Sequence, residues 1–203
     1  MQITAATSSD LEQAVVCLAT AFAQDPITGF LLQTGPGYLE RVAQFFSLLM
    51  RARMALNMPV LVARDTDSIC GAAMGNTAAP PPWPADLEEE WSNLETVVPG
   101  FNDRGAIYDE IAEKSKPQMP HYYLGVVGTR PATRGLGIGK QLLLSFCDLS
   151  ASDQLSRGVY LETANPLNVR FYERAGFAVT GQGRLGAETL WCMFLGHAPR
   201  HDA

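Results

Sequence analysis

The sequence lacks a basic excess, a long apolar run and any closely spaced pair of cysteines. Its 203 residues carry 21 acidic and 15 basic side chains, which gives a formal net charge of −6. A general nucleic-acid binder needs a surplus of Lys and Arg to neutralise phosphates, so this composition excludes that class. The apolar stretches are too short to cross a bilayer, and the first 16 residues contain no Lys or Arg. We therefore expect a cytoplasmic protein with no nucleic-acid or membrane partner.

Spacings typical of metal sites are missing as well. The four cysteines lie far apart among apolar neighbours, at Cys17, Cys70, Cys147 and Cys192. The histidines stand at His121, His197 and His201 and form no ligand motif. This pattern predicts buried thiols in a reducing compartment and no bound metal.

Length and composition favour one domain with a sizeable core. Apolar residues make up 47% of the chain and charged residues 18%, which excludes a disordered protein. A chain of this length fits a single domain spanning residues 1–203.

Hydrophobic periodicity predicts helices and strands along the whole chain. Helical spacing covers 9–24, 38–56, 102–116, 138–152 and 165–175, and an acidic helix begins at Asp86. A capping box over Ser9–Glu12 starts the first of these helices, and Asp25-Pro26 ends it. Strand-like runs cover 60–63, 68–76, 122–129, 159–162, 177–181 and 190–195. This order favours a mixed α/β sheet with a parallel crossover.

A glycine-rich turn, R-G-L-G-I-G-K, joins a predicted strand to a predicted helix. Its three glycines at alternate positions leave backbone N–H groups open to a ligand. The helix that follows directs its positive end to the same place, and two cations flank it. The turn is therefore predicted to hold a pyrophosphate through Arg134, Gly135, Gly137, Ile138, Gly139 and Lys140.

Two other interpretations of this turn stay open. Glycines between a strand and a helix can be purely structural. A dinucleotide fingerprint requires G-x-G-x-x-G rather than the G-x-G-x-G found here, yet Glu162 follows the next strand, where a ribose-binding acid would stand. A Walker A loop is excluded, because Gln141 replaces its Ser or Thr and Arg134 replaces its first glycine.

Two motifs resemble those of the GNAT acetyltransferase superfamily. Arg134, Gly137 and Gly139 fill its Q/R-x-x-G-x-G/A signature, and residues 165–177 are similar to its second motif, with the ending Tyr-x-x-x-Gly-Phe. The resemblance covers about 122–195, together with the helix–hairpin order of the first half. It implies one GNAT-like domain, with a central mixed, mostly antiparallel sheet flanked by helices and strands 4 and 5 splayed around the donor.

Within the family, the run from Leu161 to Met193 is similar to the puromycin N-acetyltransferases. This closeness is confined to the C-terminal third. The first half, which faces the acceptor, carries no equally specific match, so the antibiotic substrate does not transfer with the resemblance.

The resemblance implies acetyl-CoA as the donor. Besides the glycine-rich turn, the backbone of Val127, Gly128 and Thr129 would hold it, and a backbone N–H there would polarise the thioester carbonyl. Asn165 and Asn168 are candidates to bind the pantetheine or the nucleotide, although Asn165 fits a helix N-cap equally well.

Proton transfer is assigned by the same resemblance. Tyr172 matches the family's general acid, which protonates the leaving thiolate, although a packing role explains this aromatic residue too. For the general base, His121 has a suitable pKa range, Glu162 lies near the splay, and a chain of waters serves equally. Because neither motif contains a cysteine, we expect direct transfer in a ternary complex.

The acceptor is predicted to be a small primary amine. Phe30, Tyr122 and Trp83 in the proline-rich loop would line an apolar or aromatic pocket, although Trp83 also fits an ordinary core. A protein or peptide amine and a non-catalytic acyl-CoA-binding module are the alternatives. The sequence leaves a homodimer open.

Overall fold

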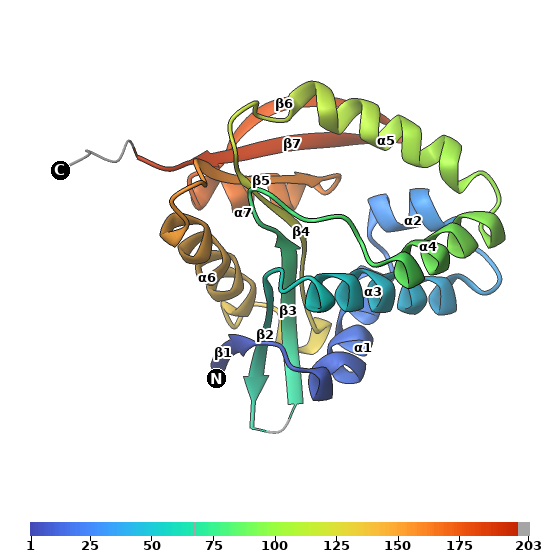
Figure 1. The fold of residues 1–203 in the computed structure, drawn as a ribbon, viewed down its shortest axis with the longest axis horizontal. Helices are drawn as coiled ribbons and strands as arrows, with labels where there is room; N and C mark the ends of the chain where they lie inside the picture. The colour runs from blue at the N-terminus through green and yellow to red at the C-terminus, as the bar shows by residue number, and fades with distance from the viewer. Residues whose placement is uncertain (67, 199–203) are drawn as a thin grey trace.

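A seven-stranded sheet in the order β1-β2-β3-β4-β5-β7-β6 runs through the protein (Figure 1). The computed structural model describes residues 1–66 and 68–198; His201, which entered the sequence analysis, lies outside this part. The strands are β1 Gln2–Ala5, β2 Val60–Asp65, β3 Ser68–Asn76, β4 Tyr122–Thr129, β5 Gly158–Thr163, β6 Ala178–Leu185 and β7 Glu188–Gly196. Only β4 and β5 pair in parallel; the other neighbours are antiparallel. The predicted mixed, mostly antiparallel sheet is confirmed.

Helices cover both faces of this sheet. One face carries α1 Leu11–Phe22, α2 Pro26–Leu32, α3 Tyr38–Ala55, α4 Ala85–Val97 and α5 Phe101–Ser115. The other carries α6 Ile138–Ser152 and α7 Pro166–Arg174. Two short 3₁₀ turns, η1 Ser8–Asp10 and η2 Pro131–Thr133, precede α1 and α6. Figure 1 shows α5 lying along β6 and β7, and α5 also contacts α2.

Two elements were not predicted from the sequence. The strand β1 has four residues, none of them fully buried, so its pattern is too short to recognise. The helix α2 begins where the sequence analysis placed only a helix end. Its N-cap Asp25 accepts a hydrogen bond of 2.9 Å from the Thr28 N–H, and Pro26 occupies the first turn, where proline is tolerated.

No single helix among the described residues is long and apolar enough to cross a membrane. The pair Ser8–Phe22 and Pro26–Leu32, bent by 100°, meets the length and composition test only when taken together.

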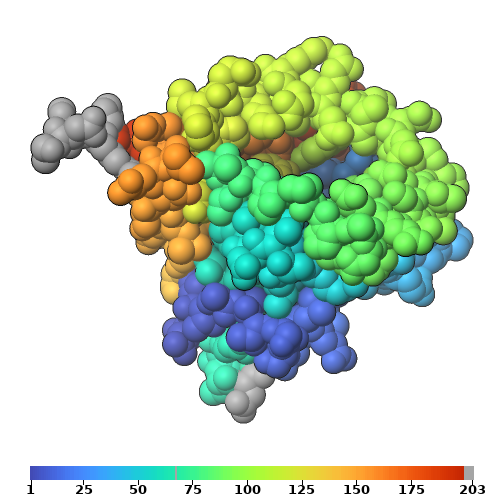
Figure 2. All heavy atoms as spheres, in the orientation of Figure 1, coloured from blue at the N-terminus to red at the C-terminus, as the bar shows by residue number. Residues whose placement is uncertain are grey.

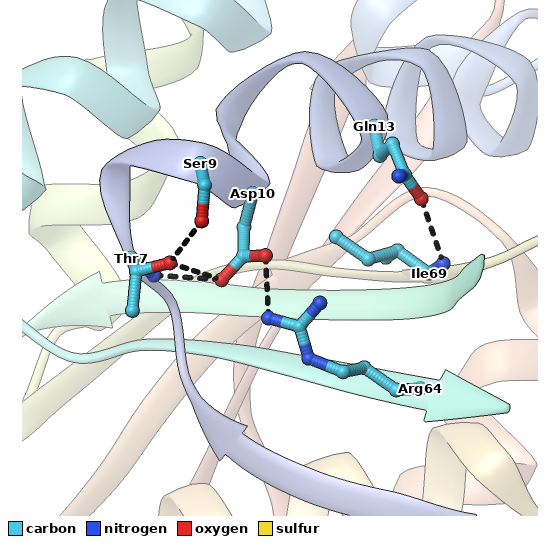
Figure 3. Close-up of polar contacts among 6 residues, drawn as sticks. All are labelled: Thr7, Ser9, Asp10, Gln13, Arg64 and Ile69. Carbon is cyan, nitrogen blue, oxygen red and sulfur yellow. Dashed lines mark hydrogen bonds and ion pairs between the residues drawn. The ribbon is translucent and has the colours of Figure 1, made fainter. Parts of the chain in front are cut away.

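The capping box that starts α1 lies two residues before the predicted one (Figure 3). The carboxylate of Asp10 accepts hydrogen bonds from the Thr7 backbone N–H and hydroxyl, both at 2.8 Å, and pairs with Arg64 of β2. One turn further on, the Gln13 side chain accepts a hydrogen bond of 3.2 Å from the Ile69 N–H in β3. These contacts fix the start of α1 to the neighbouring strands β2 and β3.

Replacing Asp10 by Ala should destabilise the protein in a pH-dependent way. The hydrogen bond from Arg64 lowers the pKa of Asp10 from its ordinary 3.8 to about 2. The stabilisation is therefore complete above about pH 4 and is lost as the pH falls toward 2. We expect Asp10→Ala to lower the free energy of unfolding by about 1 to 2 kcal/mol at pH 7.

Denaturant titrations at pH 7, pH 4 and pH 2.5 measure this difference. Ser9→Ala is the control, because its hydroxyl contacts only the Thr7 hydroxyl, at 2.8 Å. A difference between wild type and Asp10→Ala that persists unchanged at pH 2.5 would contradict the assignment.

Candidate functional site

The strands β4 and β5 stay together over only two paired positions. Tyr122 pairs with Val159 and Tyr123 with Tyr160, after which the register ends although both strands continue. Beyond Tyr123, β4 keeps β3 on one edge, and β5 keeps β7 on its far edge. The edges that face one another therefore carry backbone groups outside the ladder, which is where a ligand chain can bind as an extra strand would.

A β-bulge lies at the point where the two strands part. Met74 pairs with Val126 and Asn76 with Tyr123, so β4 uses one residue more than β3 over this stretch. The bulge shifts the alternation of side chains: Leu124 packs in the cluster under α6, whereas Val126 packs in the cluster under α1 and α3. Because a bulge releases backbone groups from the ladder, it supplies an N–H at the inner end of the opening.

Two cavities meet at this opening. The cleft cavity, of about 220 Å³, lies between β4 and β5 and is lined by residues including Asp25, Arg53, Gly125, Asn168 and Tyr172. The outer cavity, of about 590 Å³, is lined by residues including Pro80, Asp109, Glu113, Lys116 and His121. Figure 2 shows a hollow between the yellow-green α5 and the green α4 and segment after β3.

Three side chains line both cavities: Tyr108, Tyr123 and Glu162. The Tyr108 hydroxyl donates a hydrogen bond of 2.9 Å to Glu162 Oε2 and lies 3.2 Å from the Tyr123 hydroxyl. Burial raises the pKa of Glu162, and the hydrogen bonds from the tyrosines act in the opposite direction. A carboxylate with a raised pKa between two cavities is equipped to accept a proton near neutral pH.

Tyr172 lines the same cleft cavity from α7. It is 6% exposed, and its ring packs against Phe171 and Phe177 with centroids 5.2 and 5.7 Å away. Burial raises the pKa of its phenol. The hydroxyl therefore stays protonated over the physiological pH range and is available as a hydrogen-bond donor.

The glycine-rich turn lies at the far end of β4, at the N-terminus of α6. Gly135 and Gly137 have φ values of +84° and +77°, and a Cβ atom on either would meet nothing within 4 Å. Arg134 and Lys140 are exposed beside them. The Ile138 side chain is only 2% exposed and packs in the core, so only its backbone is available to a ligand. The turn thus presents open amides, two cations and a helix N-terminus together.

The other predicted donor residues take different places. Val127 and Asn168 line the cleft cavity, and Asn168 Nδ2 lies 3.5 Å from Thr163 Oγ1. Gly128 faces α1, where a Cβ atom would lie 2.7 Å from the Phe22 ring, while the Thr129 side chain lies beside Gly139. The Asn165 side chain accepts a hydrogen bond of 2.9 Å from the Leu167 N–H and acts as the N-cap of α7.

The predicted acceptor residues do not line either cavity. Tyr122 points to the α6 face, where its ring lies 5.9 Å from that of Phe146. Trp83 packs on Trp91 at 5.6 Å. Phe30 packs against a cluster under the β6–β7 hairpin. Tyr122 is buried in the core, whereas Trp83 and Phe30 are partly buried against neighbouring clusters.

His121 lines the outer cavity at the start of β4. Its Nδ1 lies 2.7 Å from the Met119 carbonyl oxygen, and its ring stacks edge-on against Tyr160 and Phe194 at 5.6 and 6.1 Å. Burial lowers the pKa of the imidazole, so it is neutral at pH 7.

Sequence reasoning missed several residues of this site. Tyr123 was passed over for its neighbour, which the alternation of a strand turns to the opposite face. Arg53 follows Phe46 and Leu49 at helical spacing, so a charged residue on an apolar face was a usable signal. Tyr108 and Asp25 reach the cavities only through the packing of α5 and α2, which no local pattern shows.

Comparison with known protein families identifies the family of this chain. Residues 40–177, more than half of it, match the acetyltransferase (GNAT) family. The protein therefore belongs to the GNAT acetyltransferase family, and the turn and splayed strands are the parts expected to bind its donor. Two solved structures of this fold hold acetyl-CoA, a GNAT family acetyltransferase from Brucella melitensis and yncA from Salmonella typhimurium. Among the described residues, no cluster of His, Cys, Asp and Glu is suited to hold a metal ion.

Solved structures agree with this fold over nearly the full chain. One similar structure is a Corynebacterium glutamicum protein of the type histone acetyltransferase HPA2 and related acetyltransferases. It has 24% identity and a TM-score of 0.72, and the match covers 98% of this chain and 97% of that one. The polyamine N-acetyltransferase of Drosophila melanogaster, which forms N-acetylagmatine, has 14% identity and a TM-score of 0.67, covering 97% and 99%. Salmonella typhimurium yncA, solved with its cofactor acetyl-CoA, has 20% identity and a TM-score of 0.57, covering 100% and 99%.

A change at the glycine-rich turn should weaken donor binding. An alanine at Gly135 must adopt a φ of +84°, which costs about 1 kcal/mol for a residue with a Cβ atom. We expect Gly135→Ala to shift the turn and to raise the Kd for acetyl-CoA about tenfold, measured by calorimetry.

Gly105→Ala is the matched control for this change. That glycine lies inside α5, away from the turn, in open space and without a positive φ. The substitution should leave the Kd unchanged and raise the free energy of unfolding by about 0.5 to 1 kcal/mol, because alanine favours a helix. Equal Kd values for wild type and Gly135→Ala would exclude the turn from donor binding.

Proposed function

We propose that this protein transfers the acetyl group of acetyl-CoA to a primary amine of a small molecule, directly and within a ternary complex. The observation that carries the proposal is the cleft cavity, which has Glu162 and Tyr172 among its lining and the β4 bulge at its inner end. A base, an acid and a released backbone N–H are the three groups that amide formation from a thioester requires.

The donor would lie along the open edge of β4. Its pyrophosphate would bind at the glycine-rich turn, and the pantetheine would run past Val127 toward the bulge. The strand rises about 3.3 Å per residue, so the acyl group would end several residues from the turn, within the cleft cavity. When bound, acetyl-CoA supplies an activated acyl carbon and a thiolate leaving group.

Proton transfers would follow from the two ionisable groups. Glu162 would accept a proton from the incoming ammonium, and the amine lone pair would form the new C–N bond at the carbonyl carbon. The released N–H at the bulge would stabilise the oxyanion, an effect of a few kcal/mol. The C–S bond would then break as the Tyr172 hydroxyl donates its proton to the thiolate. The second proton that the nitrogen loses on amide formation would pass to the Tyr172 phenolate and restore the hydroxyl.

The size of the site supports a small acceptor. The cleft cavity of about 220 Å³ is smaller than most pockets for drug-sized ligands, although the outer cavity adds about 590 Å³ beside it. The polyamine enzyme of similar fold acts on a small amine, whereas the histone acetyltransferase likeness keeps a protein amine as the alternative. The resemblance to puromycin N-acetyltransferases, confined to the C-terminal third, leaves the first half of the acceptor site undetermined.

A panel of primary amines with release of free thiol as the readout tests this proposal. Thiol release that requires both acetyl-CoA and an amine supports it. Binding of acetyl-CoA without turnover on any amine or peptide would favour the acyl-CoA-binding alternative, and a failure to bind acetyl-CoA would contradict both.

Tyr172→Phe should reduce kcat far more than it raises the KM for acetyl-CoA. The phenylalanine keeps the packing against Phe171 and Phe177 but removes the proton donor. We expect a loss of about 100-fold in kcat, in the range of general-acid catalysis. Steady-state kinetics measure it, with Phe171→Leu as a packing control. An unchanged kcat in Tyr172→Phe excludes the general-acid role.

The pH profile of kcat/KM should identify the base. If Glu162 must be ionised, the rate falls as the pH drops through its raised pKa, and Glu162→Gln loses this limb together with most activity. Tyr108→Phe removes a hydrogen bond that stabilises the carboxylate, so the limb should move to higher pH. His121→Gln should leave the limb in place; if it removes the limb instead, His121 is the base.

A further inference from the structure

Arg53 is a buried cation for which the fold provides no anion. It lies on α3, is 6% exposed, and donates one hydrogen bond, from Nη1 to the Leu49 carbonyl oxygen of its own helix, at 3.1 Å. Its Nε is fully buried without a partner. Within residues 1–66 and 68–198, no ion pair joins Arg53 to a carboxylate. An uncompensated buried charge costs several kcal/mol, so its retention points to a ligand.

Arg53 lines the cleft cavity, and its Nε and Nη2 make no hydrogen bond to any of the described residues. Nε–H and Nη2–H point along the same edge, the one that binds a carboxylate with two parallel hydrogen bonds. A Cβ atom on Gly125 would lie 3.3 Å from Arg53 Nη2 and 3.0 Å from the Tyr123 ring. Arg53 therefore meets the bulged part of β4 where glycine leaves room, and it lines the cleft cavity.

The other charges of the cleft cavity are already engaged. Asp25 accepts hydrogen bonds from the backbone and hydroxyl of Thr28, at 2.9 and 3.0 Å. Glu162 accepts one from Tyr108 at 2.9 Å. The donor's phosphates would lie at the glycine-rich turn, and Gly125 precedes the end of β4 by four residues, about 13 Å. The anion that completes Arg53 must therefore come from the second substrate.

We propose that the acceptor is a small amine that also carries a carboxylate, and that Arg53 binds this carboxylate while the amine faces Glu162. This inference rests on the proposed function and narrows its substrate class to amino acids and related zwitterions. Tyr123 lies between the two charged groups, with its ring beside Gly125 and Arg53 and its hydroxyl beside Tyr108, which bonds to Glu162. One cavity thus offers a cation and an anion, separated by a phenol, to a ligand with both charges.

Matched sets of amines test this assignment. Each set holds an α-, β- or γ-amino acid, its methyl ester and its decarboxylated amine, assayed by thiol release with wild type and Arg53→Met. Wild type should prefer the carboxylate-bearing member by about 10- to 100-fold in kcat/KM, and Arg53→Met should lose that preference. Because each amine is compared between two enzymes, its intrinsic reactivity cancels.

Two further variants keep the test sharp. Arg53→Lys retains the charge without the fork, so its preference should fall between those of wild type and Arg53→Met. Arg51→Met is the control, since that arginine lies on the same helix, 34% exposed at its side chain, and pairs with Glu90 away from the cavity. Arg53→Met should fold with an unchanged or higher Tm, because it removes an unpaired buried charge.

The outcomes separate this inference from the proposed function. If amines are acetylated but wild type ignores the carboxylate, or Arg53→Met keeps the preference, the inference fails and the acetyltransferase stands. A uniform drop in kcat for every amine would assign Arg53 to the thioester oxyanion and overturn the inference.

A binding measurement covers the case in which no amine is acetylated, which would overturn the proposed function. Amino acids should then raise the Tm of wild type but not that of Arg53→Met, if the carboxylate site exists. The absence of any such shift in wild type would overturn the inference as well.

Discussion

The parting of β4 and β5 after two paired residues is the constraint on which the rest of the structure depends. Parallel strands normally continue their ladder, because each unpaired backbone group that is buried costs free energy. Here β5 satisfies its other edge against β7, and β4 satisfies its other edge against β3. Closing the gap would bury the backbone edge against its neighbour and remove the cleft cavity. The sheet thus keeps a binding edge in its interior, where side chains from both faces reach it.

The side chains that hold this opening pack into hydrophobic clusters on both faces of the sheet. Leu124 and Tyr122 anchor β4 to the α6 cluster, and Val126 anchors it to the α1–α3 cluster, so the strand is clamped on both sides of the bulge. Between these anchors, Tyr123 and Gly125 are left to face the cavity. A backbone held on both faces suits a site in which a released N–H must point at one developing charge.

The sequence predicted most of the fold near the two motifs and little of the acceptor side. Local signals were sufficient for β4, the glycine-rich turn, α6 and α7, because glycine spacing and helical periodicity are encoded within a few residues. The strand β1 and the helix α2 were not predicted. The strand has only four residues, and the helix starts at the proline that was expected to end α1. Tyr122 and Tyr123 could not be ranked, because the burial of a strand's two faces depends on what packs there. Trp83 and Phe30 were predicted as pocket residues by type alone, and they are partly buried against the clusters that include residues of α4 and of the β6–β7 hairpin.

Charge distribution explains why the polar centre of the site tolerates burial. Glu162 is buried and accepts a hydrogen bond of 2.9 Å from the Tyr108 hydroxyl. Burial raises the pKa of this carboxyl, and the hydrogen bonding acts in the opposite direction. Arg53 has no comparable stabilisation, since its one hydrogen bond among the described residues goes to a carbonyl oxygen of its own helix. The two charges differ in this respect. A hydrogen bond from the protein stabilises the candidate base Glu162, whereas the guanidinium of Arg53 is left to be stabilised by a ligand that binds in the cleft cavity.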